Sequence, residues 1–214
     1  MAFTRVGYGQ VEPNQLSAQK TGQIYASLPL DPDVNLLQNG EFMYYDYQSG
    51  TVSATDSTGV SEPMLVFNEI KLYEPFWRTS YKDFAMIRVG DNYVTSKLAT
   101  NGPVVGKYGD GSLTPGVDAN PAHTEYPYRM DGIAPRLFKT NVGDIMTTNM
   151  VADGANVTYA VGNKLVPTKV TAQDGGETLV LTTNNAATTG MIWVVVKVTT
   201  MPDGQQAVKL QRVH

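Results

Sequence analysis

One segment near the end of the chain, residues 191–200, restricts the fold more than any other. It reads Met-Ile-Trp-Val-Val-Val-Lys-Val-Thr-Thr, so apolar or β-branched residues fill nearly every position. Such residues suit the pleated surface of a β-sheet. A turn sequence, Met-Pro-Asp-Gly-Gln, occupies residues 201–205, and residues 206–213 alternate between polar and apolar types. The pattern predicts a β-hairpin at the end of this chain.

Both faces of the first hairpin strand are apolar. One face carries Ile192, Val194, Val196 and Val198, and the other carries Met191, Trp193 and Val195. We therefore expect the strand to be covered on both sides, with Val196 in the core. A Val196→Asp variant should then fail to fold, because it would bury an unpaired charge.

Composition extends this prediction to the whole chain. The 214 residues include 20 Gly and 12 Pro, which punctuate strands with turns, and no long helical periodicity is present. The predicted fold class is all-β or mainly β. A chain of this length can form one sizeable β domain or two small ones.

Charge and cysteine content exclude several classes of function. The chain has no cysteine, which excludes disulfides, thiolate metal sites and a cysteine nucleophile. Its net charge is −4 and it has no basic run, so a nucleic-acid partner is not expected. Residues 1–9 lack the apolar region of a signal peptide, and no window has the roughly 18 apolar residues of a membrane span. We expect a soluble protein, made in a cytoplasm, with no membrane partner.

Three regions differ in composition. Residues 1–38 are rich in Gln and poor in large apolar side chains, which predicts an extended N-terminal arm that docks on another subunit or on a larger assembly and does not fold into its own core. Residues 39–135 form a β-rich region that ends in a long Gly/Pro-rich loop, residues 101–135. Residues 136–214 contain short, evenly spaced strands and are expected to form a small barrel or sandwich.

Strand patterns occur throughout the second and third regions. Besides the closing hairpin, the expected strands are residues 41–47, 64–73, 84–89, 136–140, 157–161, 164–170 and 177–183.

Motifs that would carry catalysis or bind a cofactor are incomplete. There are two histidines, His123 and His214, which are too few for a zinc cluster, and no serine lies in a nucleophile elbow. Residues 31–42 begin like a calcium loop but have Leu36 at its glycine position and Phe42 at its glutamate position. The glycine-rich residues 106–112 lack the lysine and the following helix of a phosphate-binding loop. We expect no catalytic residue, cofactor or metal.

Carboxylate pairs and aromatic clusters leave more than one interpretation open. A glycosidase pair would have to come from Glu62, Glu69, Glu74, Asp83 or Asp131, but any acidic β protein has as many. Aromatic residues next to arginine indicate core and ordinary surface, a protein interface, or a platform that stacks on sugars. The candidate interface residues are Tyr8, Tyr25, Phe76, Trp77, Arg78, Tyr81, Tyr126, Tyr128 and Arg129.

Several segments together resemble a known family. The segments are VGYGQVEPN (6–14), SAQKTGQIY (17–25), LLQNGEF (36–42), SYKDFA (80–85), PRLFKTNVGD (135–144) and TMPDGQQAVKLQR (200–212). They resemble auxiliary head proteins, of the decoration or cement type, of tailed bacteriophages. The resemblance is spread over most of the chain and includes no catalytic signature.

The resemblance implies a non-enzymatic virion protein. Such a protein would bind the major capsid protein lattice on the exterior of the capsid, as a homo-oligomer and most often a trimer, after synthesis in the bacterial cytoplasm. Two other classes remain open on the residues alone. One is a tail or baseplate structural protein, and the other is a carbohydrate-binding or receptor-binding β module.

Overall fold

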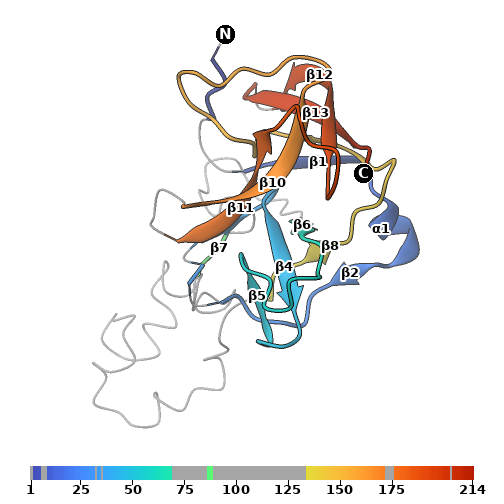
Figure 1. Cartoon of the computed structure of the whole chain (residues 1–214), viewed down its shortest axis with the longest axis vertical. Helices are drawn as coiled ribbons and strands as arrows, with labels where there is room; N and C mark the ends of the chain where they lie inside the picture. Colours follow the sequence, from blue (N-terminus) through green and yellow to red (C-terminus); the bar gives the residue numbers. More distant parts are fainter. Residues whose placement is uncertain are drawn as a thin grey trace, which may run out of the picture.

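The computed structural model of the chain describes residues 2–5, 9–31, 33–34, 36–68, 86–88, 134–171, 176–202 and 204–214. These residues form a mainly β structure with one short helix, as the composition predicts (Figure 1).

The elements follow one another in the order of the chain. The first part holds β1 (Val11–Gln15), α1 (Ser17–Thr21), β2 (Ile24–Tyr25), β3 (Leu36–Gln38), β4 (Phe42–Asp46), β5 (Thr51–Ser53) and β6 (Met64–Val66). After β7 (Met86–Arg88) come β8 (Leu137–Phe138), β9 (Ile145–Thr148), β10 (Lys164–Thr171), β11 (Glu177–Thr183), β12 (Trp193–Thr200) and β13 (Gln206–Arg212).

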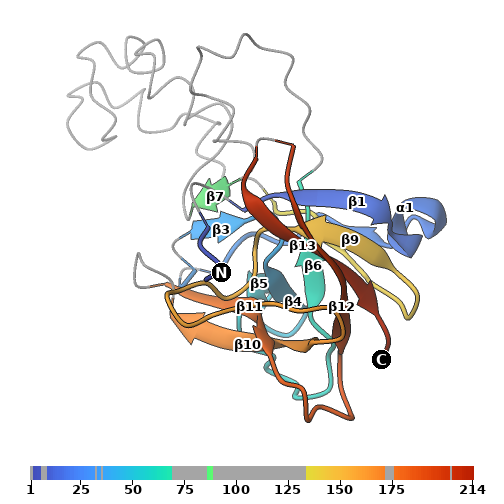
Figure 2. The ribbon, with the colours of Figure 1, turned by 90° about the horizontal axis from the view of Figure 1, so that it is seen from above.

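Most of these strands belong to one antiparallel sheet. Its order is β1-β9-β13-β12-β10-β11-β4-β6-β8-β2, with β5 added beside β4, while β3 and β7 pair with each other. The sheet curls into a half-barrel (Figure 2). It takes strands from all three of the compositional regions, so β4 and β6 of the second region lie between β11 and β8 of the third.

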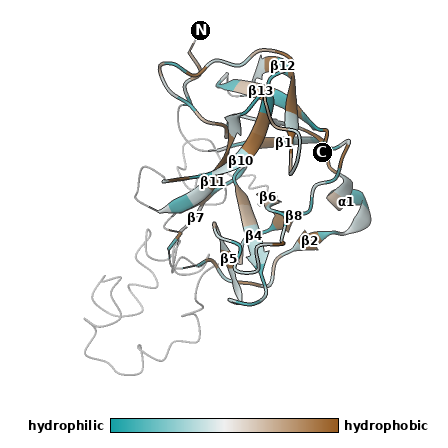
Figure 3. Cartoon of the chain, in the orientation of Figure 1, coloured by the Kyte–Doolittle hydropathy of each residue, from teal (hydrophilic) through white to brown (hydrophobic). Residues whose placement is uncertain are grey.

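Buried side chains from strands along the whole sheet form one hydrophobic core. Trp193 on β12, Phe42 on β4 and Phe138 on β8 are its largest fully buried side chains. The rings of Phe42 and Trp193 lie 6.0 Å apart, which joins strands far apart in the sequence. Figure 3 shows hydrophobic residues along β4, one of the strands that contribute to this core.

The N-terminal residues pack in this body, so the predicted extended arm is not confirmed. β1 pairs with β9, and β2 pairs with β8. Leu16 is 1% exposed and Ala18 is fully buried, and both belong to the core. The Ser17 N–H and hydroxyl donate to the Asp144 carboxylate, each over 2.9 Å. The segment has few apolar residues, but it pairs with strands that lie more than a hundred residues further along the chain, and this pairing stabilises it.

The closing hairpin is confirmed, but the prediction for Val196 is wrong. β12 and β13 pair from Trp193–Arg212 to Thr200–Gln206. The register shifts between Val195 and Lys197, so Val196 is an extra residue in the ladder. Trp193 and Val195 are fully buried, whereas Val196 is 38% exposed. Because of this bulge, side chains after Val195 do not continue the alternation that the sequence pattern predicts, and Val196 does not belong to a buried apolar face.

Buried Arg212 fixes the end of β13 to two distant segments. Its guanidinium donates to the carbonyl and hydroxyl of Thr140 and pairs with the Glu62 carboxylate. Its Nε donates to the carbonyl of His214 over 2.9 Å. The strand is therefore held by side-chain contacts as well as by its place between β9 and β12.

Candidate interface site

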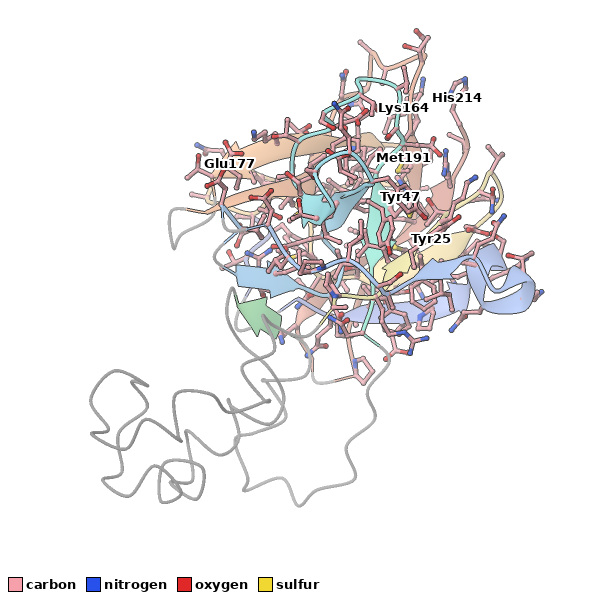
Figure 4. All side chains as sticks on the ribbon, turned by 90° about the horizontal axis from the view of Figure 1, so that it is seen from below. Tyr25, Tyr47, Lys164, Glu177, Met191 and His214 are labelled. Atoms are coloured by element: carbon pink, nitrogen blue, oxygen red, sulfur yellow. The ribbon has the colours of Figure 1, made fainter. Side chains whose placement is uncertain are left out.

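Two tyrosine rings contact Tyr45 near the end of β4, and one of them, Tyr47, is largely exposed to solvent. The ring centroids of Tyr25 and Tyr45 are 5.2 Å apart, and those of Tyr45 and Tyr47 are 5.1 Å apart. Tyr45 is buried, Tyr25 is half-buried and Tyr47 is 74% exposed. We call these three residues the tyrosine cluster. The labelled side chains of Tyr25 and Tyr47 can be followed in Figure 4.

Strand pairing and one hydroxyl pair fix the inner part of the cluster. Tyr45 pairs with Val52 of β5, and both side chains are buried on the same face of the strand pair. The Tyr45 Oη lies 2.8 Å from the Ser27 hydroxyl and accepts from the Ser27 N–H over 3.2 Å. Tyr25 packs beside it from β2. A buried tyrosine with a bonded hydroxyl gives a rigid support for a neighbouring ring.

A tight turn holds Tyr47 at the surface. The Asp46 Oδ1 accepts from the N–H of Gln48 over 2.8 Å, and the Asp46 carbonyl accepts from the Gly50 N–H over 2.9 Å. Hydrogen bonds from the hydroxyl of Ser57 and from turn residues lower the pKa of Asp46 to about 2. Gly50 has φ of 73°, which a residue with a side chain rarely adopts. Tyr47 is thus an exposed ring on a preformed turn.

The other side of β4 lines an open groove. Tyr44 alternates with Tyr45 and lies there with Val60, Pro63, Val166 and Met191 in a groove of about 690 Å³. Burial, followed by the charge of Asp56, raises the pKa of the Tyr44 phenol. Val60 is 88% exposed at the rim. The lining has one carboxylate, Glu62, and that group pairs with Arg212.

One of the nine predicted interface residues lies among the residues that the structure describes. Tyr25 is described and belongs to the tyrosine cluster. Tyr8, Phe76, Trp77, Arg78, Tyr81, Tyr126, Tyr128 and Arg129 lie outside the described residues.

The predicted chemical alternatives can be followed for some residues. Glu62 forms an ion pair with Arg212, and the other four carboxylates considered for a glycosidase lie outside the described residues. Asp31, at the start of the calcium-like sequence, accepts from the Asp33 N–H and the Thr51 hydroxyl, so it stabilises a turn. Within the described ranges, no group of three metal-ligating side chains comes together.

Sequence reasoning missed the two tyrosines that complete the cluster. The sequence pattern places Tyr45 and Tyr47 in the expected strand 41–47 and marks neither as an interface residue. The signal for Tyr47 is the turn sequence Tyr47-Gln-Ser-Gly50. An aromatic residue at the start of a turn lies beyond the end of the strand, where neighbouring strands do not cover its ring.

Comparisons with known proteins found no matching family model, curated protein or solved structure. Among the described residues, no helix is long and apolar enough to span a membrane.

Proposed function

We propose that this chain is a non-enzymatic structural protein of a tailed-phage virion that binds and stabilises the outer surface of the capsid. Its partner is the major capsid protein lattice. The proposal combines the resemblance of the sequence segments to decoration proteins with one structural observation, the exposed Tyr47 ring on its rigid support.

Tyr47 has the properties of an interface anchor. Tyrosine is enriched among the residues that contribute most to protein binding, because a large ring buries much area and loses little conformational entropy. Here the turn bonded to Asp46 and the edge-on contact with Tyr45 restrict the ring before any partner binds. Less entropy is then lost on binding, which favours association.

The packing of residues 9–31 changes how attachment is expected to work. An arm that orders on a neighbouring subunit would lose entropy on binding. In this structure that segment already contributes β1, α1 and β2 to the body. The proposed contact therefore comes from a preformed surface, and repeated copies of it on a symmetric lattice supply the stabilisation.

The test is to add purified protein to capsids that lack a decoration protein and to measure occupancy by electron cryomicroscopy. Tyr47→Ala should raise the dissociation constant about thirtyfold, the usual effect of losing an aromatic anchor worth about 2 kcal/mol. Tyr47→Phe keeps the ring and should bind nearly as wild type. Val142→Ala, a change at another exposed residue, is the surface control.

Two results would overturn the proposal. Wild-type protein that leaves such capsids bare would contradict the function. Full occupancy by folded Tyr47→Ala would contradict the assignment of the contact. The exposed ring also fits a sugar face, so a glycan array is run in parallel. Glycan binding that Tyr47→Ala abolishes, without capsid binding, would assign the chain to the carbohydrate-binding class instead.

A further inference from the structure

The second half of β12 has an edge with no described strand beside it. On the side away from β13, β10 pairs only with Trp193 and Val194. The next contact on that side is made by Val195, which exchanges backbone hydrogen bonds with Gly162 and Asn163 over 2.8 and 2.9 Å. From Val196 to Thr200, no described strand pairs with this edge. We call residues 196–200 the open edge.

The ladder determines which backbone groups point out of the open edge. In an antiparallel pair, residues that bond each other alternate with residues whose N–H and C=O face away. The Met201 N–H donates to the Gln205 carbonyl, so these two residues form a hydrogen-bonded pair. In the neighbouring pair, Thr200 with Gln206, the N–H and C=O of Thr200 therefore point away from β13. Val198 lies two residues earlier, opposite Val208, so its N–H and C=O also point away from β13. The outward bonds of Val195, on the other side of the bulge, agree with this phase.

The free edges of β1, β2 and β10 have features that hinder an added strand, which the open edge lacks. β1 contains Pro13, and β2 has two residues. On β10, Lys164 accepts a hydrogen bond from the Asn184 N–H, so every second residue from Lys164 bonds β11. Pro167 is one of the residues between these, and its backbone therefore points to the side away from β11. Proline there removes the donor that an added strand would need. Residues 196–200 contain no proline and four β-branched residues.

The surface beside the open edge accepts an uncharged strand. A groove of about 460 Å³ runs along Val198 and Thr200 and is lined by Phe3, Tyr159 and Gln206. None of these side chains is charged. Val198 is 47% exposed although Val208, opposite it, is fully buried. An apolar side chain on the buried face of the sheet therefore remains open to solvent.

We propose that the open edge pairs with the open edge of a second copy of this chain, antiparallel and about a two-fold axis at Thr199. In that register Val198 lies opposite Thr200 of the second copy, and Thr200 lies opposite Val198 of the second copy. The outward N–H and C=O groups of these residues then form four backbone hydrogen bonds. The same register places Lys197 opposite Met201 of the second copy. Like charges then do not face each other across the strands.

The identity of the occupant follows from this self-complementarity. The two outward-facing residues are symmetric about Thr199, which matches a two-fold axis. An isologous contact requires the same surface to supply both halves, and here Val198 and Thr200 do so. The inference rests on the ladder and does not depend on binding to a capsid.

The experiment replaces an outward N–H by proline. Thr200→Pro removes two of the four proposed bonds, while the free chain loses none, because that N–H faces away from β13. The matched control is Thr171→Pro, which changes an outward position of the blocked β10 edge. Self-association is measured by sedimentation equilibrium, and protection of individual amides by hydrogen exchange at low and high concentration. Circular dichroism checks that both variants fold.

We expect a dimer whose Val198 and Thr200 amides become protected as concentration rises, while the Val195 amide, already bonded, does not change. Thr200→Pro should raise the dimer dissociation constant at least about tenfold, and Thr171→Pro should leave it unchanged. A monomer at all concentrations, a trimer, or a dimer without added protection at Val198 and Thr200 would overturn the proposal. If Thr200→Pro does not fold, Val198→Lys with the exposed control Val161→Lys replaces it, and the same protection data decide.

Discussion

Replacing Leu16 with alanine tests whether the N-terminal segment belongs to the core. Leu16 is 1% exposed and lies between β1 and α1. The change removes three carbon atoms from a buried site, which by transfer alone costs about 2.4 kcal/mol, and the cavity raises this to about 3–5 kcal/mol. Because domains of this size are stable by only about 5–15 kcal/mol, the loss is a large fraction of the free energy of unfolding.

Urea denaturation measures this effect, with tryptophan fluorescence as the signal because Trp193 is fully buried. The exposed Lys20 lies on α1, the helix that follows Leu16, and Lys20→Ala should change the free energy of unfolding by less than about 0.5 kcal/mol. An arm that docks only on other subunits would give Leu16→Ala no effect on the isolated chain. An unchanged urea midpoint for Leu16→Ala would therefore refute the packing described for residues 9–31.

Two further predictions concern the hairpin and the turn. Val196→Asp should cost less than about 1 kcal/mol because the side chain reaches solvent, whereas Val195→Asp should lower stability by more than about 3 kcal/mol; equal thermal unfolding temperatures would contradict the bulge. For Asp46, whose pKa is lowered to about 2 from 3.8, the stabilisation is full above pH 3.8 and is lost as the pH falls through about 2. The stability difference between wild type and Asp46→Asn should shrink over that interval, and a difference independent of pH would argue against the turn bonds.

Elements with strong local patterns were predictable from sequence. β11 has the expected bounds, Glu177–Thr183, because alternating β-branched residues lie between two turn sequences. β4 and the closing hairpin follow the same rule. In each case the residues that form the strand also carry the signal.

Elements that depend on distant partners were not predictable in this way. β1 reads Val-Glu-Pro-Asn-Gln, which has no strand pattern, and it exists through pairing with β9. Residues 157–161 have the pattern but no ladder: the Tyr159 hydroxyl donates to the Ala152 carbonyl, and the Ala160 N–H donates to the Asn163 side chain. The tyrosine cluster likewise joins β2 to β4 by a contact between rings that spacing along the chain does not encode.

The place of β13 in the sheet determines when the fold can be completed during synthesis. β13 lies between β9 and β12, yet it is translated after every other strand of the sheet. Until residue 212 has left the ribosome, β9 and β12 each expose an unpaired edge, and Thr140 and Glu62 lack Arg212. Because an interior strand of the sheet is made after its two neighbours, the nascent chain presents two sheet edges to chaperones and to other nascent chains until β13 has emerged.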